Sequence, residues 1–184
     1  MPRVTFVKKA RNDYEQAGIK KGESYYWWKF RFGPKHMSKT APRRQQLTRS
    51  NFYISLYDLE DRINDLQADD TLSGDVESII EDIRALAEEQ EENKSNMPEG
   101  LQEGDTGQLL DERKDGLEAW ADELEGVDIS VDEDEIIEEV LSAMGIDGNV
   151  PEDQRVQFDE MVAEKTAESY QEKIDEIQGC SHSL

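Results

Sequence analysis

The sequence predicts an α+β protein that is mainly α: a small N-terminal antiparallel sheet of two or three strands, then an acidic helical body with an antiparallel helical hairpin. Three observations predict it: one aromatic stretch, apolar residues at helical spacing from residue 52 onward, and a sharp change of charge near residue 50. Residues 1–50, the head, hold thirteen Lys and Arg against three Asp and Glu, a net charge of +10. Residues 51–184, the body, hold eight against 41, a net charge of −33.

The strongest strand signal is the stretch 24–32, SYYWWKFRF, because aromatic residues favour strands. Gly33 and Pro34 follow it and supply the residues of a turn. A second strand over 36–40 is expected to return beside the first, and the alternating stretch 3–8 predicts a third. The polar, proline-bearing residues 40–48 predict a linker that completes the head.

Alternation along the aromatic strand decides which side chains share a face. The even-numbered aromatic residues from Tyr26 to Phe32 form a nearly apolar face that is expected to pack against the rest of the chain. The opposite face mixes rings with cations, and proteins hold single-stranded nucleic acid by stacking rings on bases and placing cations beside phosphates. The predicted contact residues are Tyr25, Trp27, Lys29, Arg31, Lys35, Lys39, Arg43 and Arg44.

Two other interpretations fit the same strand. The face could equally serve as an interface with protein, including the chain's own acidic body. In a purely structural interpretation, Lys and Arg only cover the ring faces by cation–π contact.

From Phe52 onward the apolar spacing is that of helices. Apolar residues recur three or four positions apart from Phe52 to Leu66, in a coiled-coil-like seam, and again from Val76 to Ala87. Residues 67–74 interrupt the pattern. Two helices joined by a short turn predict an antiparallel helical hairpin over 51–92, with acidic outer faces.

The remaining residues predict a linker and further acidic helices. Residues 93–107 collect Pro, Gly, Ser and Asn and read as a linker. The acidic helical segment 108–184 comprises one helix to Glu125, a shorter one opened by a capping box at 130–133, and a last one with Pro151 in its first turn. The C-terminal residues are expected to form a mobile tail.

Signatures of catalysis are absent from the sequence: it contains no phosphate-binding glycine loop, no HExxH and no nucleophile elbow, so we predict no enzyme activity. Cys180 is the only cysteine, which excludes a disulfide within the chain and a four-cysteine zinc site. Cys180 and His182 are too few ligands for a metal site, and the aspartates of 128–149 lack calcium-loop spacing. We therefore predict no cofactor and no metal.

The charge division suggests what the protein binds. We expect a non-enzymatic accessory protein whose head binds nucleic acid or a nucleic-acid–protein complex, while the body contacts a protein partner. The alternatives are an acidic DNA mimic that inhibits a nucleic-acid enzyme by occupying its basic groove, and a scaffold or oligomerisation module. The size and polarity resemble those of bacteriophage accessory proteins.

The first residues lack the apolar stretch of a signal peptide, and no apolar run reaches membrane-spanning length. We therefore expect no membrane partner and a cytoplasmic location, or the host cytoplasm for a viral protein. The choice among DNA, RNA and protein partners and the oligomeric state stay open at this stage.

Overall fold

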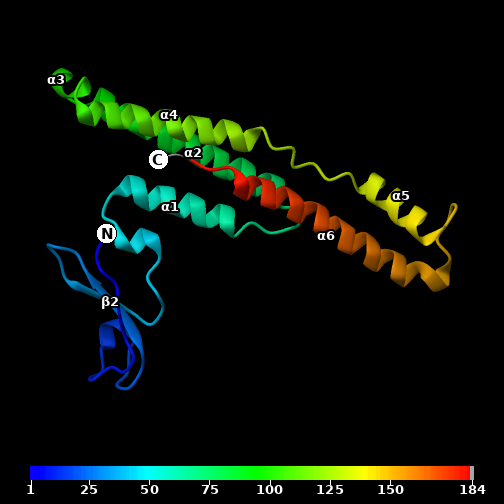
Figure 1. The fold of residues 1–184 in the computed structure, drawn as a ribbon, viewed down its shortest axis with the longest axis horizontal. Coiled ribbons are helices and arrows are strands. Elements are labelled where there is room, and N and C mark those ends of the chain that lie inside the picture. The colour runs from blue at the N-terminus through cyan, green and yellow to red at the C-terminus, as the bar shows by residue number, and fades with distance from the viewer. Residues whose placement is uncertain (183–184) are drawn as a thin grey trace. The chain divides into compact units, whose positions relative to one another are not determined.

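The computed structural model describes residues 1–182 and divides the chain into two compact units, Met1–Asp58 and Leu59–Leu184 (Figure 1). The N-terminal unit holds β1 (Thr5–Val7), η1 (Glu15–Ala17), β2 (Tyr25–Lys29), β3 (Lys35–Ser38), η2 (Arg44–Leu47) and the first half of α1 (Asn51–Asn64). The helical unit holds the end of α1, then α2 (Leu72–Ser95), α3 (Glu99–Gln102), α4 (Asp105–Glu125), α5 (Glu133–Met144), η3 (Glu152–Gln154) and α6 (Arg155–Gly179). The predicted class, mainly α with a small N-terminal sheet, is confirmed.

The division into units nearly coincides with the change of charge. Residues 1–58 hold thirteen Lys and Arg against four Asp and Glu, and residues 59–184 hold eight against 40. The net charges are therefore +9 and −32, and each unit is folded around side chains of its own.

The sheet of the N-terminal unit has three antiparallel strands in the order β1-β2-β3, as the sequence predicts. Trp27 of the central strand lies opposite Thr5 on one side and Met37 on the other. β2 ends at Lys29, before the aromatic stretch does, because the chain turns over residues 30–34 to reach β3. The alternation of faces therefore stops at Lys29.

Each face of this sheet is covered by a different segment. On one face Tyr25 packs with Ala10 and Ile19, which arrive from the β1–β2 connection. On the other, the buried ring of Trp28 stacks on His36 and donates from Nε1 to the Gln46 carbonyl at 3.1 Å. The stretch 40–48 is therefore not a free linker: it contains η2 and closes the second face of the sheet.

The most extensive helix pairing is that of α2 with α4, which run antiparallel. Lys94 binds Asp111, Lys114 binds Glu91, and Arg84 binds Asp122 and Glu125, so the residue numbers of the partners rise on one helix as they fall on the other. The two helices bury an apolar stripe each, and all of these side chains are at most 5% exposed: Leu72, Val76, Ile79, Ile83, Leu86, Leu117, Trp120 and Leu124.

The helices of the predicted 51–92 hairpin, α1 and α2, are both present and are joined by a short connection. Arg62 of α1 reaches Asp82 and Ser78 of α2, yet the apolar stripe of α2 lies mainly against α4. The predicted linker 93–107 is correspondingly short: α2 runs to Ser95, and α3 and the start of α4 occupy much of the remainder.

The last two long helices, α5 and α6, form a second antiparallel pair, joined by the Lys165–Glu139 ion pair at 2.6 Å. The N-cap of α5 lies two residues later than predicted: Asp132, not Ser130, caps the helix, and its side chain accepts from the Glu135 amide at 3.1 Å. Gly145 ends the helix in the left-handed conformation, at φ 67°. Pro151 precedes the short η3 turn, which leads into α6.

The end of α6 returns to the centre of the helical unit, where Ile174 and Ile177 are buried. His182, which the sequence assigns to a mobile tail, contacts the Trp120 ring and lies 2.8 Å from Glu60. The rest of that predicted tail, residues 183 and 184, lies outside the described residues. No helix within residues 1–182 is both long and apolar enough to cross a membrane.

Candidate nucleic-acid interface

Three of the predicted contact residues gather where β2 turns into β3. The strand register places Lys29 directly opposite Lys35, and both side chains are exposed. Arg31 lies in the turn between them and is also exposed. Because residues directly opposite on an antiparallel pair point to the same face, the two lysines lie side by side on the face that carries Trp27.

No carboxylate in the described part of the chain forms an ion pair with these three cations. Like charges directly opposite in a sheet are destabilising, so the Lys29–Lys35 pair weakens this end of the hairpin in the free protein. A bound anion would remove that repulsion. The arrangement thus favours an anionic ligand at the β2–β3 turn.

Aromatic rings border the cations. The Lys35 ammonium lies 4.3 Å from the centroid of the half-buried Trp27 ring, which it partly covers. Phe32 is 77% exposed, and the Arg31 guanidinium lies 5.3 Å from its ring. The prediction that Phe32 packs on the apolar face is wrong, because it follows the end of β2 and projects from the turn.

Arg49 is a further cation at this turn that the sequence pattern did not indicate. It donates from Nη2 to the Phe32 carbonyl at 2.6 Å, and its guanidinium lies 4.7 Å from the Phe30 ring centroid. It also fills the space beside Gly33, where an added Cβ would lie 2.3 Å from Nη2. Arg49 is seventeen residues from Phe32, and a contact at that distance has no local sequence signal.

Tyr25 cannot serve as a stacking platform as predicted. Its side chain is 5% exposed and packs in the core of the N-terminal unit, with its ring centroid 5.5 Å from that of Tyr14. A hydrogen bond with Tyr14, together with burial, raises the pKa of the Tyr25 hydroxyl. The alternation that placed Tyr25 with Trp27 is correct, but the β1–β2 connection covers that end of the face.

The other three predicted residues lie away from the turn. Lys39, beyond the far end of β3, pairs with Glu23 at 2.9 Å. Arg43 opens η2, where its amide donates to the Gln46 side chain at 3.0 Å, and the Arg44 guanidinium lies 4.2 Å from the Tyr57 ring. The candidate interface therefore reduces to the turn cluster, which we define as Trp27, Lys29, Arg31, Phe32, Lys35 and Arg49.

No group of three or more His, Cys, Asp and Glu side chains placed to hold a metal ion occurs within residues 1–182. Burial, followed by the charges of Glu123 and Glu176, raises the pKa of Cys180, which disfavours the reactive thiolate form. No family model, curated protein or solved structure matches this chain, so similarity to known proteins adds nothing to the chemistry of these residues.

Proposed function

We propose that this protein is a non-enzymatic accessory protein that binds single-stranded nucleic acid through the turn cluster, while its acidic helical unit contacts a protein partner. The observation that carries the proposal is the exposed Lys29–Lys35 pair, in which two like charges face each other without a carboxylate partner. Phosphate oxygens can pair with both ammonium groups, and the accompanying release of condensed counterions favours binding.

Phe32 supports a single-stranded over a double-stranded ligand. A ring that is 77% exposed can stack on a base only where that base is accessible, as it is in single strands. The Arg31 guanidinium lies beside this ring and Arg49 contacts the Phe32 carbonyl, and guanidinium groups can bind phosphate by paired hydrogen bonds. The cluster therefore combines the two kinds of contact that hold a single strand.

Fluorescence anisotropy of the full-length protein with a labelled oligothymidine tests the proposal. The affinity of the wild-type protein should fall with rising salt, because phosphate contacts release counterions. Replacing Lys29, Arg31 and Lys35 together by Ala should reduce the slope of log affinity against log salt by about 2, from roughly 0.7 per phosphate contact on a single strand. Phe32→Ala should weaken binding by about tenfold, since a stacked base contributes roughly 1–3 kcal/mol.

The matched control replaces Lys8, Lys20 and Lys21 by Ala, which removes the same charge from exposed positions of the same unit outside the turn cluster. This control should retain most of the salt slope. Equal losses in the two triple variants would show that positive charge acts without a defined site. Absence of wild-type binding at low salt would refute nucleic-acid binding altogether.

A second candidate function, an acidic DNA mimic, is favoured by the outer face of α2. Glu77, Glu81, Glu88 and Glu92 are exposed there. Positions four apart on a helix are separated by about 6 Å along its axis, close to two phosphate steps of about 3.4 Å on one DNA strand. Competition between this protein and DNA for a basic nuclease, lost when these four residues become Gln, would support it.

A further inference from the structure

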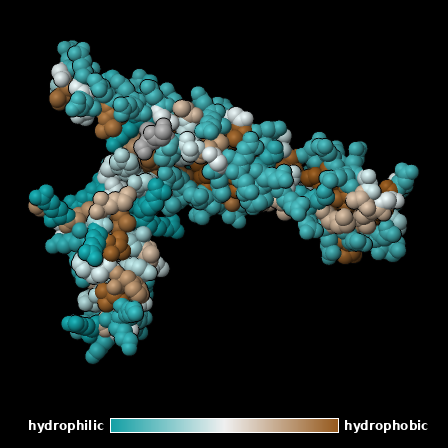
Figure 2. Space-filling model, in the orientation of Figure 1, coloured by the Kyte–Doolittle hydropathy of each residue, from teal (hydrophilic) through white to brown (hydrophobic). Residues whose placement is uncertain are grey.

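The α5–α6 pair leaves much of its apolar surface uncovered. Within α5 only Ile136 and Val140 are buried, whereas Ile137 and Leu141 are half-buried. On the facing part of α6, Phe158 is half-buried and Val156 is 71% exposed. Figure 2 shows brown and tan surface over this end of the helical unit, surrounded by hydrophilic teal.

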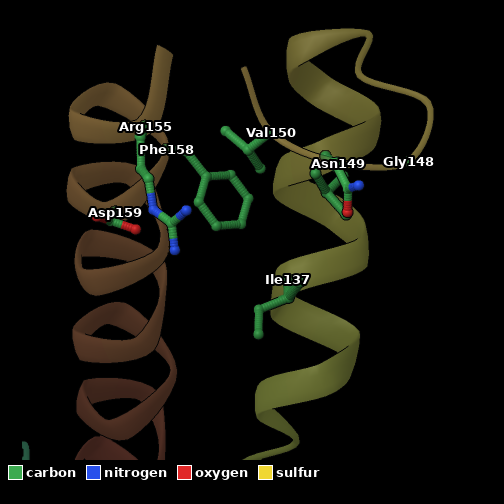
Figure 3. A pocket seen from close by; sticks show the side chains of 8 residues that line it. Ile137, Gly148, Asn149, Val150, Arg155, Phe158 and Asp159 are labelled. Atoms are coloured by element: carbon green, nitrogen blue, oxygen red, sulfur yellow. The ribbon is translucent and has the colours of Figure 1, made fainter. Parts of the chain in front are cut away.

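A cavity of about 300 Å³ opens between the two helices. Ile137 and Leu141 line it from α5, Phe158 from α6, and Val150 from the loop that joins the helices. In Figure 3 the Phe158 ring points from α6 into this space, between Val150 and Ile137, with Arg155 and Asp159 beside it. A large apolar side chain of a ligand would fit such a lining.

The charge around the cavity limits which ligand can approach. Residues 133–164 contain eleven Asp and Glu and a single basic residue, Arg155, a net charge of −10. Two copies of this surface would repel each other, so association of the chain with itself through it is disfavoured. A cationic ligand is attracted instead.

We propose that the α5–α6 pair binds an amphipathic basic helix of another protein, which inserts a large apolar side chain beside Phe158 and places Lys or Arg against the surrounding carboxylates. A third helix laid along two antiparallel helices covers their exposed apolar stripe, a common form of peptide recognition. This inference rests on the proposed function, which assigns a protein partner to the acidic helical unit. It adds the chemistry of that partner, a basic amphipathic helix.

The test measures binding of a synthetic peptide to the full-length protein by titration calorimetry at about 0.15 M NaCl, where charges beyond about 8 Å are screened. The probe is a Lys/Leu peptide of about five helical turns with all Leu on one face. Its isomer has the same composition but no apolar stripe. The striped peptide should bind at least about tenfold more tightly than the isomer, a difference of about 1.4 kcal/mol.

Variants of the protein locate the site. Phe158→Ala should weaken binding of the striped peptide by about tenfold, from the apolar area that the ring would otherwise bury. Leu109→Ala is the matched control, since Leu109 is a 43% exposed apolar residue on α4, elsewhere on the acidic unit; it should change affinity by less than about twofold. Equal weakening by the two substitutions, or equal affinity for the two peptides, would overturn the proposal.

A second pair of variants does not touch the apolar side chains and so does not depend on the folding of Phe158→Ala. Asp134 and Glu138 of α5 are exposed, as are Glu88 and Glu92 of α2. Replacing the first two by Lys should weaken binding by at least about tenfold, and replacing the second two should weaken it less than about threefold. Equal effects would overturn a site at α5–α6.

The same preparations separate this proposal from the others. The α5 variants should bind oligothymidine as the wild type does. The peptide assay and the nucleic-acid assay therefore report on different sites, and failure of one proposal does not decide the other. Sedimentation of the free wild-type protein should show no self-association through this site, that is, none that the Phe158→Ala substitution removes. Such an association would identify a second copy of the chain as the occupant and overturn the proposal.

Discussion

Gly74 and Gly107 occupy the same position, the third residue, of α2 and α4, yet substitution by Ala should change stability in opposite directions. A Cβ at Gly74 would meet nothing within 4 Å. A Cβ at Gly107 would lie 1.9 Å from the Gln102 carbonyl oxygen, far inside the 3.4 Å at which ordinary contact begins. Gly107 thus allows the chain of α3 to pass close over the start of α4.

The magnitudes follow from helix propensity and from packing. Ala is favoured over Gly in a helix by up to about 1 kcal/mol, so Gly74→Ala should stabilise the protein by roughly 0.5–1 kcal/mol. Gly107→Ala gains the same preference but must displace backbone, at a cost of roughly 1–3 kcal/mol or more, so a net loss of about 1–2 kcal/mol is expected.

Urea unfolding followed by far-UV circular dichroism checks both values. With a slope of about 1–3 kcal/mol per molar urea, the two variants should differ in midpoint by about 1 M. The reasoning would be refuted if Gly107→Ala unfolded at the same urea concentration as Gly74→Ala, or at a higher one. The two helix starts would then be equivalent, and α3 would not lie against α4 as described.

Three further predictions concern the two units. Trp28→Phe should destabilise the N-terminal unit by about 1–3 kcal/mol, because the Gln46 carbonyl loses its donor; an unchanged urea midpoint would contradict that hydrogen bond. Hydrogen bonds from the Lys20 amide and the Lys39 side chain lower the pKa of Glu23 below 4.5, so its stabilising effect is present above that value and lost as pH falls through the lowered one. The urea midpoints of wild type and Glu23→Gln should therefore differ at neutral pH and converge in acid. The melting temperature of the helical unit should rise between about 0.02 M and about 0.5 M NaCl, because salt screens repulsion among its carboxylates; a fall would show that its ion pairs outweigh that repulsion.

Features that depend on neighbouring residues could be predicted without the structure. The division of charge near residue 50 is a property of composition, and apolar spacing along single segments predicts that α1, α2 and α6 are helices, although α2 begins earlier and α6 later than predicted. The three strands and their turn likewise follow from aromatic content and the Gly33-Pro34 pair. Alternation likewise places Lys29 on the face of Trp27, whereas the strand register that sets Lys35 opposite Lys29 is known only from the structure.

Features that depend on which segments meet were decided only in the tertiary structure. Both α1 and α4 carry an apolar stripe that could pack against α2. The periodicity of one helix does not show which other helix packs on it, so it could not choose between them. Alternation places Tyr25 and Trp27 on the same face of β2, but the β1–β2 connection fully buries only Tyr25. Phe32 is exposed because β2 ends at Lys29. Arg49 joins the turn cluster through a contact across seventeen residues. The sequence by itself determined where the strands and the long helices approximately lie and what charge they carry, whereas the short η2 and α3 and the surfaces available for binding depended on long-range packing, which no local pattern encodes.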